Sequence, residues 1–282
     1  MQRFLKLIIS CLLIPLLFTA CASNQNQFEE YSEDELYQLS RQYMIDHKYS
    51  KAISAYQALE TRFPFGQYGE QAQLEVIAGY YQASEYEAAI TAADRFTRLH
   101  PDHPNADFAY YYKGLSNFDA NRSLFDRFFE MDMSQRDLGT ARDSFQDFSE
   151  LVSKYPDSRF AADARGRMTF LRNLMARGEV HIADHYFQRG SYAAAANRGR
   201  FVVEHYQETP AVPDGLAVMV QAYRLMNLPE LEKDSLRTLQ LNFPNHYALD
   251  ADGNFKDNYK LKTSESINKA RDVAGYAKKN KF

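Results

Sequence analysis

The chain has 282 residues, of which 45% are hydrophobic and 25% are charged, and its formal net charge is −4. These values are those of a soluble globular protein and allow one or two ordinary domains. The two cysteines do not form a CxxC pair, which excludes the cysteine-based metal and redox motifs that need one.

The first residues have the pattern of an export signal. Arg3 and Lys6 give a basic start, and an apolar run follows over residues 7–18. A transmembrane helix needs about 20 apolar residues, whereas this run is shorter and ends in small residues beside a cysteine. We therefore expect residues 1–20 to be a signal peptide that is cleaved.

The segment Phe18-Thr19-Ala20-Cys21 resembles a bacterial lipobox, in which the cysteine thiol takes a diacylglycerol and its freed amino group is then acylated. Phe18 departs from the aliphatic residue usual there, and the alternative is an ordinary signal peptide with an incidental cysteine. Acyl chains contribute about 0.8 kcal/mol per buried CH₂ and anchor a protein without a spanning helix. The resemblance implies a covalent lipid on Cys21, and Ala22 in place of Asp implies the outer membrane.

Two segments are expected to lie outside the folded body. Residues 21–32 are polar and lack an apolar pattern, which suits a flexible tether. Residues 245–282 form a basic C-terminal extension, and from Phe255 onward it has eight basic and three acidic residues, a net charge of +5. We interpret this tail as solvated and mobile, although it could also touch acidic partners or lipid headgroups. The folded body is then expected over residues 33–244.

Within the body, the sequence repeats the spacing of tetratricopeptide (TPR) hairpins. These are pairs of antiparallel helices with a period of about 34 residues, a small residue where the helices cross, and a closing proline. The first unit places Leu36, Leu39, Ser40 and Tyr43 on one helix, then Tyr49, Ala52, Tyr56 and Leu59 on the next, and ends at Pro64. The second unit has Val76, Tyr80, Tyr86, Ala89, Ala93, Phe96 and Pro101, and a late unit has Leu216, Met219, Tyr223, Leu236, Leu239 and Pro244.

The middle of the chain is longer than regular repeats require. Its first excess is the segment 121–137, which we expect to be an insertion loop with buried aromatic residues in the third repeat. Its second excess has no proline between Arg159 and Gly190, which predicts one long helix. A fourth unit follows with Ile182, Ala183, Tyr186, Tyr192, Ala195 and Val202.

These patterns predict an all-α fold, a TPR helical-hairpin superhelix of five repeats and ten helices with an insertion loop in repeat 3. Because a single hairpin cannot bury its apolar face, neighbouring hairpins cover it and stability adds along the stack. Alanines are expected at the crossings, where a larger side chain would cost about 1 to 3 kcal/mol: Ala52, Ala89, Ala141 and Ala195. The alternative is a non-repetitive helical bundle.

The sequence contains few signs of an enzyme. It has no GxSxG, GxxxxGK or HExxH motif and no GxGxxG after a strand. His181 and His185 are four residues apart on a predicted helix, so they could face one metal ion with Asp184 or Glu179 nearby, but no third ligand is evident. We interpret them as packed or solvated histidines, and we expect no catalytic residue, no metal site and no cofactor.

More specific residues lie within the repeats. They are Arg62-Phe63-Pro64-Phe65-Gly66-Gln67-Tyr68 in the first, His103-Pro104-Asn105, Gly114-Leu115 and Asn117 in the third, Phe128-Phe129 to Arg136-Asp137 in the insertion, and Asn197-Arg198 in the fourth. On these residues the chain resembles the BamD family, TPR lipoproteins of the β-barrel assembly machinery in the bacterial outer membrane. The resemblance covers residues 1 to about 244.

The resemblance implies a non-enzymatic scaffold on the periplasmic face of the outer membrane. It implies binding to BamA through the POTRA domain nearest the barrel, contact with the lipoproteins BamC and BamE, and recognition of C-terminal segments of unfolded outer-membrane proteins. An arginine of the fourth unit pairs with a BamA carboxylate in the family, and the matching residue is Arg198, next to Asn197. No nucleic acid is implied.

The resemblance also implies a substrate groove at Phe63, Pro64, Phe65 and Tyr68. The family usually has tyrosine at the position of Phe63, so this chain lacks a hydroxyl there. Two alternative functions are a TPR lipoprotein scaffold that organises peptidoglycan or envelope enzymes, and a hydrolase within a helical array.

Overall fold

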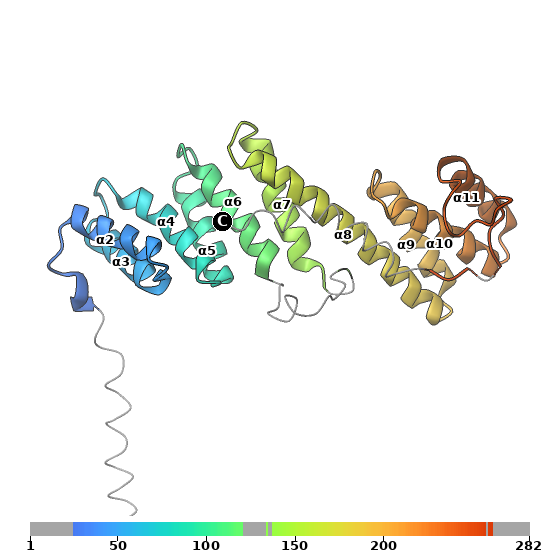
Figure 1. Ribbon diagram of the computed structural model, residues 1–282, viewed down its shortest axis with the longest axis horizontal. Coiled ribbons are helices and arrows are strands. Elements are labelled where there is room, and N and C mark those ends of the chain that lie inside the picture. The colour runs from blue at the N-terminus through green and yellow to red at the C-terminus, as the bar shows by residue number, and fades with distance from the viewer. Residues whose placement is uncertain (1–24, 121–133, 135–136, 258, 262–282) are drawn as a thin grey trace, which may run out of the picture. The chain divides into compact units, whose positions relative to one another are not determined.

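The computed structural model describes residues 25–120, 134, 137–257 and 259–261. The expected signal peptide, Cys21, most of the insertion and the end of the basic extension lie outside these residues. The chain divides into two compact units, residues 1–99 and residues 100–282. In the described part, ten α-helices form five consecutive hairpins, the first two in one unit and the other three in the second (Figure 1).

Each helix packs on the next within its unit. The first unit contains the 3-10 turn η2 (Gln25–Phe28), α2 (Glu33–Ile45), α3 (Tyr49–Arg62), α4 (Gly69–Gln82) and α5 (Tyr86–Leu99). The second contains α6 (Ala106–Ala120), α7 (Gly139–Lys154), α8 (Ala161–Gln188), α9 (Tyr192–His205), α10 (Val212–Leu225) and α11 (Pro229–Asn242). The described residues contain no strand, only an isolated bridge between Leu249 and Phe255. The predicted all-α TPR fold of five repeats is therefore confirmed.

The first, second, fourth and fifth hairpins turn in the same way between their two helices. One residue of each turn is left-handed, with φ between 55° and 69°, and the next amide donates a hydrogen bond to a tyrosine carbonyl in the last turn of the first helix. The left-handed residues are His47, Ser84, Gly190 and Asn227, and the tyrosines are Tyr43, Tyr80, Tyr186 and Tyr223. This bond satisfies a carbonyl that would otherwise lack a partner at the helix end.

Small residues let neighbouring helices approach each other, both within a hairpin and between hairpins. The four alanines expected at crossings, Ala52, Ala89, Ala141 and Ala195, are all buried. Two glycines are held even more tightly, because a Cβ on Gly114 would lie 2.6 Å from the Phe148 ring and one on Gly199 would lie 2.5 Å from the backbone oxygen of Gly215. The contact of α9 with α10 is therefore one of backbone against backbone.

The predicted long helix is confirmed as α8, which has 28 residues and packs on α7, α9 and α10. Gly178 lies in its middle, where glycine costs about 1 kcal/mol of helix propensity. The structure shows what the glycine makes room for: a Cβ there would lie 2.5 Å from Leu138 and 3.2 Å from the backbone oxygen of Ser134.

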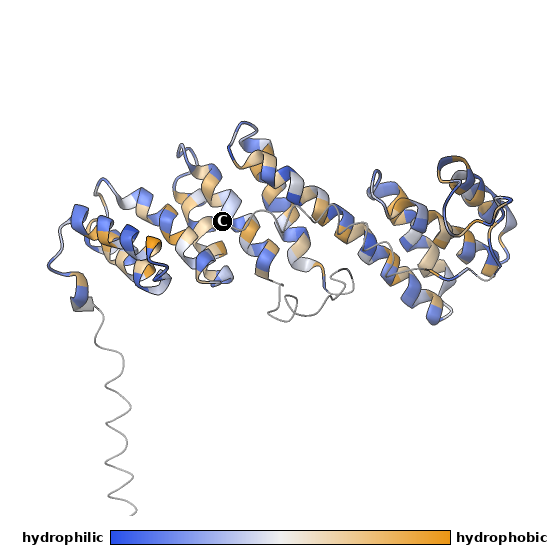
Figure 2. Cartoon of the chain, viewed as in Figure 1, coloured by the Kyte–Doolittle hydropathy of each residue, from blue (hydrophilic) through white to orange (hydrophobic). Residues whose placement is uncertain are grey.

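The helices carry hydrophobic and hydrophilic residues on different faces (Figure 2). Among the described residues, no helix combines the length and the apolar character needed to cross a membrane.

Both expected ends of the folded body need correction. Residue 32 is too late as the first boundary, because Phe28 is 5% exposed and packs in the core of the first hairpin. Arg62 also donates hydrogen bonds to the carbonyls of Phe28 and Glu29. Residue 244 is too early as the last boundary, because four apolar side chains after it are buried against α10 and α11: Ala248, Leu249, Phe255 and Tyr259. The solvated tail is thus a wrong prediction for the described residues up to 261.

Candidate functional site

The expected substrate residues lie on the loop between α3 and α4. α3 ends at Arg62 with Phe63 as its C-cap, and Pro64, which cannot continue a helix, follows. Phe63 and Tyr68 are half-buried against the core of the first hairpin, whereas Pro64 is exposed and Phe65 is fully exposed at 102%. The loop thus has two residues that anchor it and two that project into solvent.

Contacts with α2 fix this loop. The Tyr68 ring stacks on Tyr37 with centroids 4.2 Å apart and an interplanar angle of 9°. Its hydroxyl donates to Asp34 at 2.8 Å, which raises the pKa of Tyr68, and its backbone amide donates to Glu33 at 2.9 Å. A Cβ on Gly66 would meet the Glu33 carboxylate, so the loop lies directly on the first turn of α2.

The carboxylate of Glu75, on α4, links the residues around this loop to α2 and α3. It accepts hydrogen bonds from the hydroxyls of Tyr37, at 2.9 Å, and of Tyr56, and from the amide of Gln71 at 2.9 Å. Burial, with the bond to Glu75 and its charge, raises the pKa of Tyr37 to about 12. The sequence did not predict a role for Glu75, because it resembles any other acidic residue on the polar face of a helix. These contacts fix the loop. The exposed Pro64 and Phe65 can therefore contact an apolar partner with little loss of conformational entropy.

The expected BamA-binding residues lie on α9 in the second unit. Arg198 Nη1 lies 2.9 Å from Glu179 Oε2 of α8. The Glu179 side chain is 6% exposed, whereas that of Arg198 is 39% exposed, and Asn197 beside it is exposed. Burial alone would lower the pKa of Arg198, but the bond to Glu179 and its charge raise it. Glu179 and Tyr186 of α8 thus hold a guanidinium whose side chain is still partly exposed.

A cleft of about 630 Å³ lies beside Glu179, lined by α8, by the start of α7 and by three residues before α7, Ser134, Asp137 and Leu138. Arg142, His181 and His185 line it, together with Ile182, which is 37% exposed and is not the core residue that the repeat pattern predicts. Across the described ranges, no group of three or more His, Cys, Asp and Glu residues is arranged to hold a metal ion. Glu179, considered from the sequence as a neighbour of the two histidines, instead pairs with Arg198.

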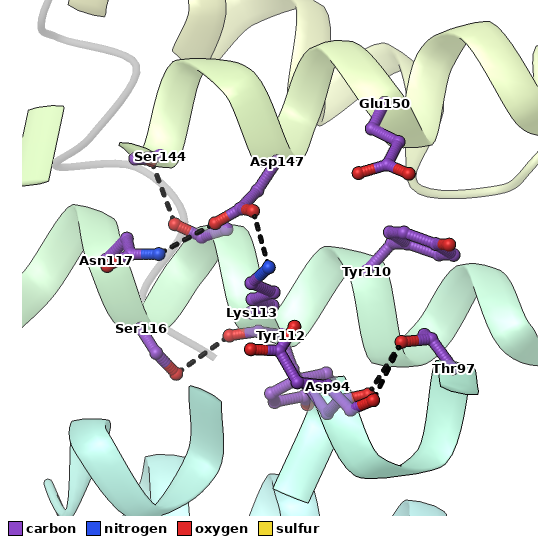
Figure 3. Close-up of polar contacts among 12 residues, drawn as sticks. Asp94, Thr97, Tyr110, Tyr112, Lys113, Ser116, Asn117, Ser144, Asp147 and Glu150 are labelled. Carbon is purple, nitrogen blue, oxygen red and sulfur yellow. Dashed lines mark hydrogen bonds and ion pairs between the residues drawn. The ribbon is translucent and has the colours of Figure 1, made fainter. Parts of the chain in front are cut away.

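The third hairpin contains a buried polar network between α6 and α7 (Figure 3). Asp147 accepts a hydrogen bond from Asn117 at 2.7 Å and lies 3.2 Å from Lys113 Nζ, while Ser144 donates to the carbonyl of Gly114 at 2.9 Å (Figure 3). A buried carboxylate costs free energy unless it is paired. Asn117, one of the residues on which the family resemblance rests, therefore has a structural role in pairing the two helices.

Comparison with known proteins places these residues in a family. A family model described as "YfiO: Outer membrane lipoprotein" matches residues 29–239. The "Outer membrane protein assembly factor BamD" of Neisseria meningitidis serogroup B is 36% identical over 246 residues, covering 85% of this chain and 92% of that protein. The chain belongs to the BamD family.

Other BamD proteins are similar over comparable lengths. The Vibrio cholerae protein is 31% identical over 83% of this chain and 97% of its own length, and the Xylella fastidiosa protein is 31% identical over 82% of this chain and 80% of its own length. The BamD family is one of assembly scaffolds, not of enzymes. The family match spans both the 63–68 loop and Arg198, so the two candidate sites belong to the shared part of the chain.

Proposed function

We propose that this chain is a lipid-anchored scaffold of the outer-membrane β-barrel assembly complex, attached through Cys21 to the periplasmic face of the outer membrane. In this proposal the second unit docks on BamA through Arg198 and Asn197. The first unit holds the C-terminal segment of an unfolded outer-membrane protein at Phe63, Pro64, Phe65 and Tyr68. BamC and BamE are further partners within the same complex.

The observation that carries the docking proposal is the setting of Arg198. The Arg198 side chain is 39% exposed while that of its partner Glu179 is 6% exposed, so a buried carboxylate fixes an arginine that still reaches the surface. An arginine fixed at one end loses less side-chain entropy when it pairs with a carboxylate of a partner. Removing such an arginine typically costs about 2 to 5 kcal/mol of binding free energy.

The direct test is titration of the purified BamA POTRA domain nearest the barrel into this chain. Arg198→Ala should weaken binding by at least tenfold, whereas Arg189→Ala, which removes an exposed arginine at the end of α8, should leave it unchanged. Full affinity of Arg198→Ala would remove this assignment.

Loss of Arg198 also leaves Glu179 buried without its ion pair, which could destabilise the fold and imitate a loss of binding. The double variant Arg198→Ala with Glu179→Gln separates the two effects because it neutralises the buried position. If its melting temperature recovers and its binding does not, the lost contact is with the partner. Recovery of both would mean that Arg198 acts only on stability.

A further inference from the structure

The described residues of the segment 245–261 form a strap that is not helical and folds back on the second unit. The amide of Asp250 donates to the carbonyl of Asn254 at 2.9 Å, and that of Lys256 to Ala248 at 3.0 Å, which closes a tight turn around the Leu249 to Phe255 bridge. Figure 1 shows this segment, toward the red end of the colour bar, beside α10 and α11.

The strap covers the face where α8 and α10 meet. These are the first helices of the fourth and fifth hairpins, and they pack against each other. Phe255 and Tyr259 are buried in a cluster with residues of α10 and α11, at 5% and 7% exposure. Leu261 packs on that cluster and on two others that contain Val180 and Ala183 of α8. The strap therefore places aromatic side chains on α10 and α11 and the aliphatic side chain of Leu261 on α8.

A buried carboxylate on this face, that of Asp214, binds the strap. Asp214 Oδ2 of α10 is paired with Arg177 Nη1 of α8 at 2.6 Å, and both side chains are less than 10% exposed. Asp214 Oδ1 accepts a hydrogen bond from the Tyr247 hydroxyl at 2.8 Å and lies 3.2 Å from His246 Nε2. The phenol of Tyr247 is thus recognised by a buried acceptor that α8 holds in place.

The rim supplies two further contacts. Arg224 of α10 lies over the Phe255 ring, with its guanidinium carbon 5.1 Å from the centroid, and Gln240 of α11 donates to the carbonyl of Gly253 at 2.9 Å. A cation above a ring is attracted to its face. The strap is therefore held by the means that bind an extended peptide: apolar contacts for aromatic rings, a cation over a ring, and bonds to the backbone.

We propose that the α8–α10 face is a binding groove for an extended peptide with aromatic side chains, and that residues 245–261 are its intramolecular occupant. Helical-hairpin arrays use such grooves to bind extended segments. Because the chain itself tethers the strap beside this face, the strap competes at an effective concentration of about millimolar. A peptide of the same chemistry therefore binds weakly while the strap is seated and strongly once it is loosened.

The test uses the full chain and a fluorescent peptide with the sequence of residues 245–261, measured by anisotropy. Phe255→Ala with Tyr259→Ala should bind this peptide at least tenfold more tightly than the unchanged chain does. The control Asp252→Ala, an exposed position on the turn of the strap, should bind as the unchanged chain does. A peptide with alanine at the positions of Phe255 and Tyr259 should bind none of them. Equal affinity of the folded double variant and the Asp252 control would overturn the proposal.

A second measurement covers the case in which the double variant does not fold. Hydrogen exchange of the unchanged chain is followed with millimolar peptide, which should speed exchange of the strap amides of Leu249 and Lys256 and leave those of α3 unaffected. Unaltered exchange in the strap would overturn the proposal. Neither measurement involves a partner protein, so this inference and the role proposed for Arg198 can fail separately.

Discussion

We predict that Gly199→Ala destabilises the chain, because α9 and α10 are in backbone contact at this residue. A Cβ at this position would lie 2.5 Å from the backbone oxygen of Gly215, 3.0 Å from Val218 and 3.1 Å from Met219. The oxygen belongs to a helix backbone and cannot rotate away, so the two helices must move apart. Overpacking costs about 1 to 3 kcal/mol, and a backbone obstacle favours the upper end of that range. Alanine regains about 1 kcal/mol of helix propensity, which leaves a net loss of about 2 kcal/mol.

Urea denaturation followed by far-ultraviolet circular dichroism measures this loss. Gly139→Ala in the same unit is the matched control, because the nearest atom to its Cβ would be a carboxylate oxygen of Asp137 at an ordinary 3.5 Å. We expect Gly199→Ala to unfold at lower urea and Gly139→Ala to unfold at the same urea as the unchanged chain or higher. A Gly199→Ala protein as stable as the control would refute the backbone contact.

Three further predictions concern charge and backbone conformation. Burial alone would raise the pKa of Asp214, but its hydrogen bonds and the charge of Arg177 lower it, so the stability it provides is present above pH 3.8 and is lost as pH falls. Asp214→Asn should therefore cost about 3 kcal/mol near neutral pH and flatten the acid limb of a plot of urea midpoint against pH. Ser84→Gly should stabilise the chain by about 1 kcal/mol in thermal melts, because Ser84 has φ 62°, and Ser84→Ala should give no such gain. Glu75→Gln should lower the pKa of Tyr37 from about 12 in an absorbance titration, and no shift would mean that burial alone raises it.

The repeats could be predicted because their marker residues occupy fixed places. The tyrosines at the first-helix ends lie where the turn makes its hydrogen bond, as in Tyr80 and Tyr223, and the alanines lie where helices cross. The length of α8 followed from the absence of proline between Arg159 and Gly190. Each of these signals is local in sequence or recurs at a fixed spacing, so it does not depend on knowing which helices touch.

Other features depend on contacts between distant residues. Glu75 looks like a solvated charge, and Glu179 like a neighbour of the two histidines, until the neighbouring helices bring Tyr37 and Arg198 to them. The strap was hidden for a different reason, because the basic residues around it dominate the composition while its buried aromatic residues follow no helical or strand period. The burial of Phe28 could not be predicted, because Phe28 is a single apolar residue in a polar segment and a single residue forms no periodic pattern.

We propose that this member of the BamD family acts in outer-membrane protein assembly as a scaffold that binds BamA. The most direct measurement is identification by mass spectrometry of the proteins that co-purify with the full chain from detergent-solubilised outer membranes. We predict that BamA is recovered, and that its amount falls with Arg198→Ala and not with Arg189→Ala. Recovery of the chain with peptidoglycan or its enzymes and without BamA would contradict this function.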